Sequence, residues 1–509
     1  MIEFEVDTCG NKLENHYMKA KRKSYGVFEV KYNLKVIKSG SKIGMYMPFV
    51  TDELKGKIAE VTIRKTKKKS TFLAKLNQFV TIRKATEGKM LFKLGDTLEV
   101  KIKVIQDAER PSKIFPDGKV DMLSLIPKRT SNGYRIFVTE FRKADERWLR
   151  MWYCHQRGSG RQIEIRRYVN IETLGKLFGQ YQAEGTKDAK LKLRFEFCNK
   201  SIEEHQDFIS YLMKIGIPKN KIFCSCSFHP SIKDIKKHLQ NFEGRMGLKV
   251  SYLHPSPESK RSYGFRTFVR NRVIIDTLLS ALDRIRKLLV REQWDTDVRL
   301  FADSFFSKLL TGDGTLDIHT KNREYGYPYA RIKIVDRQLE YLKDYAVIMR
   351  KLGFKPHIIE KRIFVVSGCT LSNLLYLHKI RAFENTNNWE KLVLCIGMYM
   401  DGRRHKTNYR FLDLVKLDSF TSFDLMKKYN LQLRTVNDWL NNKEKEGLLI
   451  GTRKRPYAVR WKVTNKAKIF AEILSKWKRE FNEFLKLKKA TNLIDLLDSL
   501  KTKGRRLSE

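Results

Sequence analysis

Cysteine is scarce in this sequence, and the few cysteines form no disulfide or metal-binding pattern. The seven are Cys9, Cys154, Cys198, Cys224, Cys226, Cys369 and Cys395. Cys224 and Cys226 stand close together, but no second pair follows at the spacing of a zinc site. We therefore expect reduced thiols in an intracellular protein, with neither a disulfide framework nor a zinc site.

Long hydrophobic runs are also missing. No stretch of about 18 apolar residues occurs, so we expect no membrane span and no membrane partner. The first six residues alternate apolar and polar side chains and lack the basic start and apolar run of a signal peptide. The expected location is cytoplasmic and nucleoid-associated.

Acidic residues are in short supply relative to basic ones. The chain has 57 Asp and Glu against 103 Lys and Arg, which gives a formal net charge of +46. Such an excess repels itself in a compact fold, and phosphate neutralisation by nucleic acid is its commonest use. A general lysine-rich bias and a membrane surface are the alternatives. We expect double-stranded DNA as the partner, with RNA also possible.

The remaining composition is that of a globular protein. The chain has 509 residues, of which 42% are hydrophobic and 11% aromatic, and 11 are proline. This length is enough for several domains.

Residues 1–130 have the pattern of a β-rich domain. Apolar and polar residues alternate with period two over residues 27–32, 59–63 and 97–104, which predicts a small antiparallel barrel or sandwich. Residues 64–69 are basic and predict a hairpin that is either a solvated loop or a phosphate-contacting arm.

A Pro- and Gly-containing stretch, residues 111–129, indicates a linker. Further strands are expected at residues 134–141, 147–154 and 162–168. The segment 131–170 therefore leads into the next domain.

Two acidic helix ends dominate the rest of the chain. Residues 177–185 (LFGQYQAEG) and 306–314 (FSKLLTGDG) each have the pattern of an apolar helix that ends in a carboxylate followed by glycine. The glycine predicts a left-handed helix stop. Glu184 and Asp313 would then lie at helix C-termini, where the helix dipole disfavours an anion. A cation between them would offset this cost, and two hard carboxylates suit Mg²⁺.

Small residues predict that these two helices pack against each other. Gly175, Gly179 and Ala183 recur every four residues on the first helix, and Ser307 and Thr311 do so on the second. Such faces let two helix backbones approach closely and place Glu184 beside Asp313. Lys308 interrupts the second helix, and we expect it to loosen the packing.

Each acidic motif heads a similar series of elements. The first, over residues 171–290, predicts strands and helices that alternate and contains an insertion at about residues 231–257. The second, over residues 291–388, repeats the order. Repetition of so specific a unit favours a duplicated core.

Residues 389–490 predict a helical region followed by helix, turn, helix and hairpin. The helices are expected at residues 419–429 and 434–446, and two strands flank a basic turn at residues 453–455. A long helix follows at residues 466–489. This is the order of a winged helix. Residues 491–509 form a basic tail.

The two acidic stretches resemble the signature motifs of the LAGLIDADG homing endonucleases, and the resemblance covers about residues 170–385. The matching residues are Leu177, Gly179, Ala183 and Gly185 in the first copy and Leu309, Asp313 and Gly314 in the second. The resemblance implies a monomeric pseudo-dimer of two αββαββα halves, with the motif helices at the interface and both sheets in the DNA major groove. It also implies Mg²⁺-dependent double-strand cleavage, with Glu184 and Asp313 as the catalytic, metal-binding acids.

The predicted fold class is therefore α+β: a duplicated αββαββα core between an N-terminal β-rich domain and a C-terminal winged helix. The basic and polar side chains expected to contact DNA are Lys192, Arg194, Arg266, Arg270, Lys321, Arg323, Arg331, Lys333, Lys361, Arg434, Asn437, Arg453, Lys454 and Arg455. A basic residue that assists the reaction is sought among Arg266, Arg270 and Lys361.

Two other functions are compatible with the same fold. One is a DNA-binding regulator without catalysis, and the other is an RNA-splicing maturase. The termini lack the residues of a splicing intein, so we expect a free-standing protein. The presence of both acids favours cleavage over binding alone.

Overall fold

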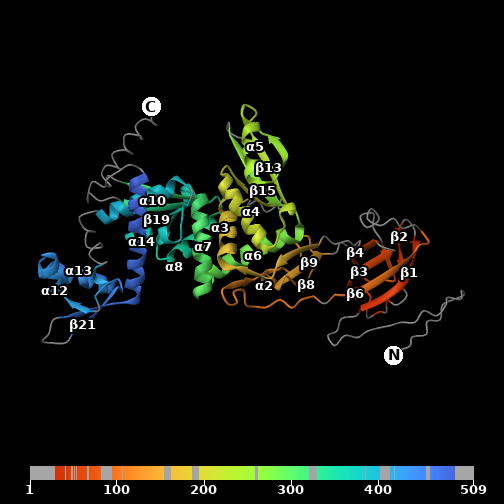
Figure 1. The fold of residues 1–509 in the computed structure, drawn as a ribbon, viewed down its shortest axis with the longest axis horizontal. Helices are drawn as coiled ribbons and strands as arrows, with labels where there is room; N and C mark the ends of the chain where they lie inside the picture. The colour runs from red at the N-terminus through yellow and green to blue at the C-terminus, as the bar shows by residue number, and fades with distance from the viewer. Residues whose placement is uncertain are drawn as a thin grey trace. The chain divides into compact units, whose positions relative to one another are not determined.

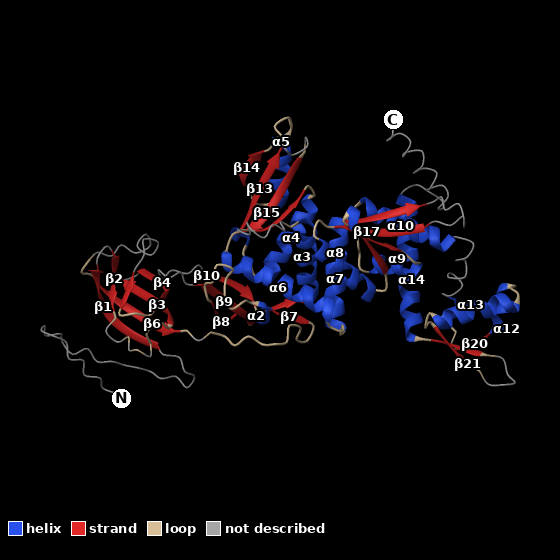
Figure 2. Cartoon of the chain, turned by 180° about the vertical axis from the view of Figure 1, so that it is seen from behind, coloured by secondary structure: helices blue, strands red, loops and turns tan. Residues whose placement is uncertain are grey.

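The structure is a computed structural model and describes part of the chain (Figure 1). The described residues are 29–487 apart from 40–41, 48–49, 51, 53, 66–67, 82–93, 106, 154–161, 186–193, 258–261, 320–328, 385, 402–412, 418 and 454–458. These residues form an α+β protein with several separate sheets. Helices and strands alternate from α3 onward, whereas strands dominate before it (Figure 2).

The chain divides into two compact units. The first consists of Met1–Leu174 and Gly185–Leu288, and the second consists of Gly175–Glu184 and Leu289–Glu509. Most of helix α3 (Ile171–Glu184) therefore belongs with the second unit. Within the described residues, no helix is both long and apolar enough to cross a membrane.

The first unit begins with a six-stranded antiparallel sheet in the order β4-β3-β6-β1-β2-β5. Its strands are β1 (Glu29–Ser39), β2 (Lys42–Tyr46), β3 (Ile58–Lys65), β4 (Lys68–Lys75), β5 (Phe79–Thr81) and β6 (Thr97–Val104). The inward residues, among them Val36, Val61 and Val100, are fully or almost fully buried and form one core. The period-two pattern correctly predicted β3 and β6, and Lys65 pairs with Lys68 across the predicted basic hairpin.

The next part of the first unit contains a three-stranded sheet, β10-β9-β8, and a two-stranded sheet, β11-β7. Its elements are β7 (Lys119–Asp121), α2 (Met122–Leu125), β8 (Ile136–Lys143), β9 (Glu146–Tyr153), β10 (Gln162–Arg166) and β11 (Tyr168–Asn170). The prediction of a linker at residues 111–129 is wrong. Val120, Met122 and Leu125 are fully buried, and Asp121 caps α2 by accepting a hydrogen bond from the Leu123 amide.

A four-stranded sheet in the order β12-β15-β13-β14 completes the first unit. Its elements are β12 (Phe195–Asn199), α4 (Ile202–Ile215), η2 (Lys219–Lys221), β13 (Ile222–Phe228), α5 (Ile235–Met246), β14 (Val250–Pro255), β15 (Tyr263–Val269) and α6 (Arg272–Arg291). Helix α4 begins after Ser201, which caps it, and ends at Gly216, which adopts a φ of 106°. The segment predicted as an insertion holds α5 and β14, and β14 extends the sheet in parallel with β13.

The second unit contains a four-stranded antiparallel sheet in the order β16-β17-β19-β18. Its elements are α7 (Thr296–Asp313), β16 (Gly314–His319), β17 (Tyr329–Val335), α8 (Leu339–Lys351), β18 (Lys355–Ile359), η3 (Glu360–Arg362), β19 (Phe364–Gly368) and α9 (Leu371–Lys379). Strand β19 begins only at Phe364, because residues Glu360–Arg362 form a turn of 3-10 helix and Ile363 has a left-handed φ of 52°.

The two four-stranded sheets have corresponding strand orders. The order β12-β15-β13 in the first matches β17-β19-β18 in the second, with α4 and α8 in equivalent chain positions. In both sheets the last strand lies between its two partners and is antiparallel to each. Among the described residues, one strand lies between α3 and α4 and two lie between α7 and α8, so the two series of elements correspond only in part.

The C-terminal part of the second unit contains a three-stranded sheet, β20-β22-β21. Its elements are α10 (Asn387–Asp401), β20 (Ser419–Thr421), α12 (Ser422–Tyr429), α13 (Leu433–Lys445), β21 (Leu449–Thr452), β22 (Arg460–Val463) and α14 (Asn465–Leu487). The predicted helix at residues 419–429 begins late, because residues 419–421 pair with β22 and Thr421 forms a capping box with Asp424. Trp439 and Trp461 are core residues. The basic tail lies outside the described residues.

A candidate catalytic centre at the ends of two packed helices

Helices α3 and α7 lie side by side over most of their length (Figure 1). An ideal Cβ on Gly175 would lie 2.8 Å from the Ser304 Cβ, and one on Gly179 would lie 2.2 Å from the Phe305 carbonyl oxygen. The predicted small face of α3 is therefore confirmed. Phe178 on α3 also meets the edge of the Phe301 ring, with centroids 6.4 Å apart.

The face that α7 presents differs from the predicted one. The α7 atoms nearest to the α3 glycines belong to Phe301, Ser304, Phe305 and Lys308. Ser307, predicted to form the small face, instead donates its hydroxyl to the Arg381 carbonyl at 3.3 Å. The prediction for Ser307 is therefore wrong, because α7 is rotated so that this residue faces the segment after α9.

Lys308 does not separate the helices. Its side chain is 5% exposed, and its Cβ lies 3.1 Å from the ideal Cβ position of Gly179. The two backbones still meet closely at Gly179, so the expectation that Lys308 loosens the packing is wrong. A lysine fits here because the residue opposite it has no side chain, and a long aliphatic stem can lie along an apolar surface.

The two helices that carry the candidate acids are in contact where they end. An ideal Cβ on Gly312 would lie 2.4 Å from the Ala183 Cβ and 3.2 Å from the Glu184 Cγ. Asp313 follows Gly312 directly, and both Glu184 and Asp313 are half-buried. The close contact at Ala183 and Gly312 therefore brings together the ends of the two helices that carry Glu184 and Asp313.

The glycine after Asp313 acts differently from the prediction. Gly314 has a φ of −88°, so it is not a left-handed helix stop. Its Cβ would fall 2.4 Å from the Leu310 carbonyl oxygen, so lack of space is what requires glycine there. Gly185 forms a β-bridge with Phe197 directly after α3. The residue after each acid therefore takes part in β pairing: Gly314 starts strand β16, and Gly185 forms the bridge.

A buried polar network lies behind Asp313. Tyr345 on α8 is fully buried, and its hydroxyl donates to the Asp336 carboxylate at 3.1 Å. Burial raises the pKa of Tyr345 well above its usual value, the charge of Asp336 raises it further, and the Gln182 side chain and Asp313 also act on it. Gln182 lies on α3, two residues before Glu184. The network thus connects the last turn of α3 with the sheet that follows α7.

The sequence reasoning missed Tyr345, Asp336 and Gln182. Tyr345 follows the helical spacing of buried positions in α8, so it was indistinguishable from a core aromatic. Asp336 precedes α8 and its Oδ1 also accepts from the Gln338 amide at 3.0 Å. Gln182, a polar residue in the last turn of α3, was the signal available.

The donor set fits a divalent cation that takes part of its shell from elsewhere. In the described part of the chain, no group of three or more His, Cys, Asp or Glu side chains is placed to hold a metal ion. Glu184 and Asp313 offer two hard oxygen ligands, and Mg²⁺ is commonly held by one or two carboxylates together with waters and substrate phosphates.

The basic residues predicted on the first sheet are engaged with its own side chains. Arg194 and Arg266 approach the buried Glu196 carboxylate at 3.4 and 3.7 Å. Arg270 donates to the Tyr252 hydroxyl at 3.0 Å and lies over the Phe268 ring. Lys192 lies outside the described residues.

The second sheet and the C-terminal region carry the other predicted DNA contacts. Arg331 is 3.3 Å from Asp317, and Lys333 lies over the Phe364 ring. Lys361 is exposed in the turn between β18 and β19. Four of the candidates lie outside the described residues: Lys321, Arg323, Lys454 and Arg455.

The predicted DNA contacts of the C-terminal region lie on helix α13 and just after strand β21. Arg434 in its first turn is exposed and Asn437 is half-buried. Arg453, just after β21, forms two contacts with the Glu444 carboxylate, at 3.1 and 2.5 Å, which raise the pKa of the arginine. Arg453 therefore packs against the helix and over the Trp461 ring.

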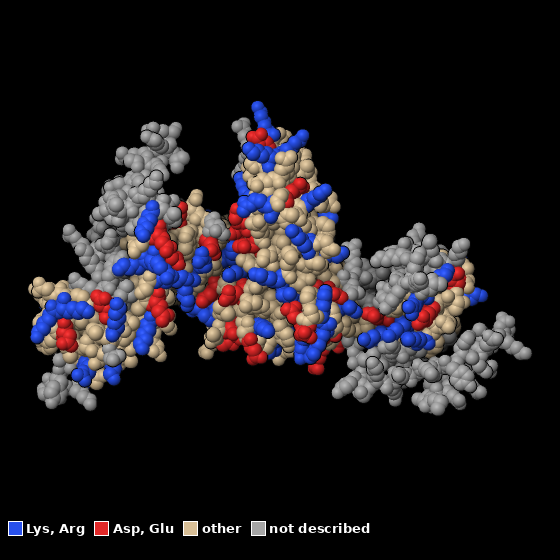
Figure 3. Space-filling view, in the orientation of Figure 1, with Lys and Arg blue, Asp and Glu red and all other residues tan. Residues whose placement is uncertain are grey.

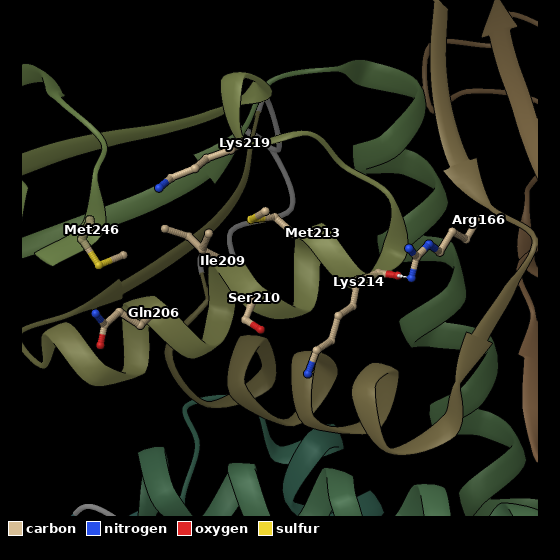
Figure 4. A pocket seen from close by; sticks show the side chains of 8 residues that line it. All are labelled: Arg166, Gln206, Ile209, Ser210, Met213, Lys214, Lys219 and Met246. Carbon is tan, nitrogen blue, oxygen red and sulfur yellow. Dashed lines mark hydrogen bonds between the residues drawn. The ribbon is translucent and has the colours of Figure 1, made fainter. Parts of the chain in front are cut away.

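A hollow of about 440 Å³ lies elsewhere, in the first unit (Figure 4). Apolar Ile209, Met213 and Met246 line it together with basic Arg166 and Lys219. Arg166 bonds the Lys214 carbonyl at its edge (Figure 4). Its lining contains no carboxylate.

Comparison with models of known protein families gives no match, and comparison with curated proteins also gives none.

Proposed function

We propose that this protein is a site-specific DNA endonuclease of the LAGLIDADG type that hydrolyses both strands of its target with Mg²⁺. In this proposal, residues 171–290 and 291–388 are the two αββαββα halves of a pseudo-dimeric core. The C-terminal sheet with α12 and α13 is a winged helix that adds a second DNA contact. The single observation that carries the proposal is the close approach of Ala183 and Glu184 to Gly312, the residue before Asp313.

Glu184 and Asp313 would hold the cation and position it against the scissile phosphate. When bound, Mg²⁺ supplies a Lewis acid that activates water and stabilises the leaving oxygen. The α3–α7 contact holds the two helix ends together, because the helix backbones touch at Gly175 and Gly179. The net charge of +46 and the corresponding sheets support DNA as the substrate.

The test is cleavage of a randomised plasmid library by the full chain with Mg²⁺, followed by sequencing of the cut ends. We expect cutting at a preferred site, and at least about a hundredfold loss in Glu184→Gln and in Asp313→Asn, because each amide removes a ligand charge. Asp303→Asn is the matched control, since Asp303 lies on the same helix and pairs with Arg299 at 2.9 Å. Equal cutting by the wild type and both acid variants would reject the site.

A DNA-binding regulator without catalysis is the second candidate. It is favoured by the small donor set, since the described residues supply two carboxylates and no larger metal-binding group. The same library distinguishes the two functions. Selective binding without any cut member, at Mg²⁺ and Mn²⁺ concentrations up to about 10 mM, would establish the regulator.

A further inference from the structure

The outward face of the N-terminal sheet is a second charged surface, separate from the acid pair. Side chains alternate along β1, so that Leu34 and Val36 are buried while Lys31, Asn33 and Lys35 are exposed. We define the outer face by residues from five neighbouring strands. They are Lys31, Asn33 and Lys35 on β1, Glu99, Lys101 and Lys103 on β6, Thr62 and Arg64 on β3, Tyr46 on β2 and Phe79 on β5.

The register of the sheet places like charges opposite each other. Lys31 pairs with Lys101, whose partner on the other side is Thr62. Glu99 stands between Asn33 and Arg64, and Glu60, a second acid on the same face, pairs with Lys103. Like charges directly opposite each other in a sheet disfavour the pairing, and a polyanion laid along this row would be attracted by both lysines.

One end of the same face is already covered within the first unit. Arg150 of β9 lies 3.2 Å from the Glu60 carboxylate, and Trp152 packs against Ile58. Glu60 and Ile58 therefore anchor the sheet to the strands that follow it. The part with Lys31, Lys35 and Tyr46 lies beyond this anchor, and Lys and Arg side chains lie over these strands in Figure 3.

An exposed aromatic ring adjoins the lysines. Tyr46 is 48% exposed and pairs with Phe79. The register that pairs Val36 with Met45 places Lys35 next to Tyr46. The Phe79 ring packs on Gly44, since an ideal Cβ on Gly44 would lie 2.6 Å from that ring. Phe79, the cross-strand neighbour of Tyr46, is therefore held in place. A fixed aromatic surface beside cations is the combination that binds unpaired bases and their phosphates.

We infer that the outer face binds single-stranded nucleic acid, with phosphates on Lys31, Lys35 and Lys101 and a base stacked on Tyr46. This site goes beyond the proposed endonuclease. It stands whether or not the acid pair cuts DNA, because none of its residues belongs to the helices that carry Glu184 and Asp313.

The charge part of the inference is tested on the full chain with a fluorescein-labelled 30-nucleotide oligo-dT and fluorescence anisotropy. We expect Lys31→Glu with Lys35→Glu to weaken binding about tenfold or more. Lys236→Glu with Lys237→Glu on α5 changes the net charge equally and is the matched control, since both lysines are exposed on a different element. Equal losses in the two double variants would overturn the site, because bulk charge would then account for binding.

Folding is checked in the same variants. Lys31→Glu places a carboxylate opposite Lys101, so its unfolding temperature should be unchanged or higher while its affinity falls. Loss of affinity together with a lower unfolding temperature would overturn the assignment of Lys31 to ligand binding.

The stacking part is tested with Tyr46→Ala and Tyr46→Phe. We expect about a fivefold or larger loss of oligo-dT affinity in the alanine variant and retention in phenylalanine, because the ring and not the hydroxyl carries the stack. Unlabelled duplex of the same length serves as competitor. If the Lys31→Glu/Lys35→Glu protein loses duplex affinity more than oligo-dT affinity, or if both Tyr46 variants bind as the wild type does, single-stranded nucleic acid is not the ligand.

Discussion

At the scale of single residues, the stability contributed by a buried polar group depends on its protonation and on its individual hydrogen bonds. His205 on α4 is fully buried among the rings of Phe197, Phe242 and Phe265. Its Nδ1 lies 2.8 Å from the Thr267 hydroxyl, and its Nε2 lies 3.1 Å from the Asn199 carbonyl. The carbonyl can only accept, so Nε2 carries the proton and donates, while Nδ1 accepts from Thr267.

We predict that His205 makes the first unit less stable in acid. Burial lowers its pKa to about 4, so the folded state binds fewer protons than the unfolded state below pH 6.5. Stability from this group is present above the unfolded pKa and is lost as the pH falls toward 4. The loss between pH 7.5 and 4.5 is roughly 2.5 kcal/mol. Urea unfolding at both pH values measures it.

The control is His254, which is exposed on β14. His254→Gln should keep the wild-type pH dependence, and His205→Gln should flatten it. An unchanged slope in His205→Gln would contradict the assignment of the acid sensitivity to this residue.

A second residue-level prediction concerns the hydroxyl behind Asp313. Tyr345→Phe removes the donor to Asp336 inside the protein and leaves a buried carboxylate oxygen without it. We expect a loss of about 1–3 kcal/mol in urea unfolding, against no change in Tyr46→Phe, whose hydroxyl is on an exposed side chain. If Tyr345→Phe leaves the free energy of unfolding unchanged, the hydrogen bond contributes nothing to stability.

At the scale of elements, the contact between α3 and α7 determines whether the acids meet. The small residues of α3 predicted its contact face, because Gly175, Gly179 and Ala183 stand out in an otherwise bulky helix. The facing residues of α7 could not be predicted in the same way. Phe301, Phe306, Leu309 and Leu310 are all buried around its circumference, so no stripe of the sequence marks the side that meets α3.

We predict that Gly179→Ala disrupts this contact. The new methyl group would lie 2.2 Å from the Phe305 carbonyl oxygen, so the helices must separate at a cost of about 2 kcal/mol or more. The apparent unfolding temperature and the cleavage rate should both fall. Gly244→Ala on α5 is the control, since no atom lies within 4 Å of its ideal Cβ. That variant should be about 0.5–1 kcal/mol more stable, as expected for alanine in a helix.

At the scale of the whole molecule, the charge imbalance dictates how the protein responds to salt. With a net charge of +46, binding to DNA releases many counterions. We predict that the logarithm of the affinity falls against the logarithm of the salt concentration with a slope steeper than about −5. Fluorescence anisotropy with duplex DNA between 50 and 300 mM salt measures this slope, and a flat response would contradict nucleic-acid binding by charge.

The amino-acid sequence by itself determined the local elements and the chemistry that they carry. Caps and glycines set the ends of α4, alternation set β3 and β6, and the two acidic motifs marked Glu184 and Asp313. These features depend on residues that are close together in the sequence, so they can be predicted from the sequence alone.

Only the tertiary structure decided which distant groups meet. The rotation of α7 that turns Ser307 toward Arg381, the burial of residues 119–125, and the placing of Tyr345 behind Asp313 all depend on how separate elements pack. The same holds for the pairing of Lys31 with Lys101, which needs the register of strands about 70 residues apart. Packing of whole elements is cooperative, so side chains that look alike in sequence acquire different neighbours, and with them different charges and functions.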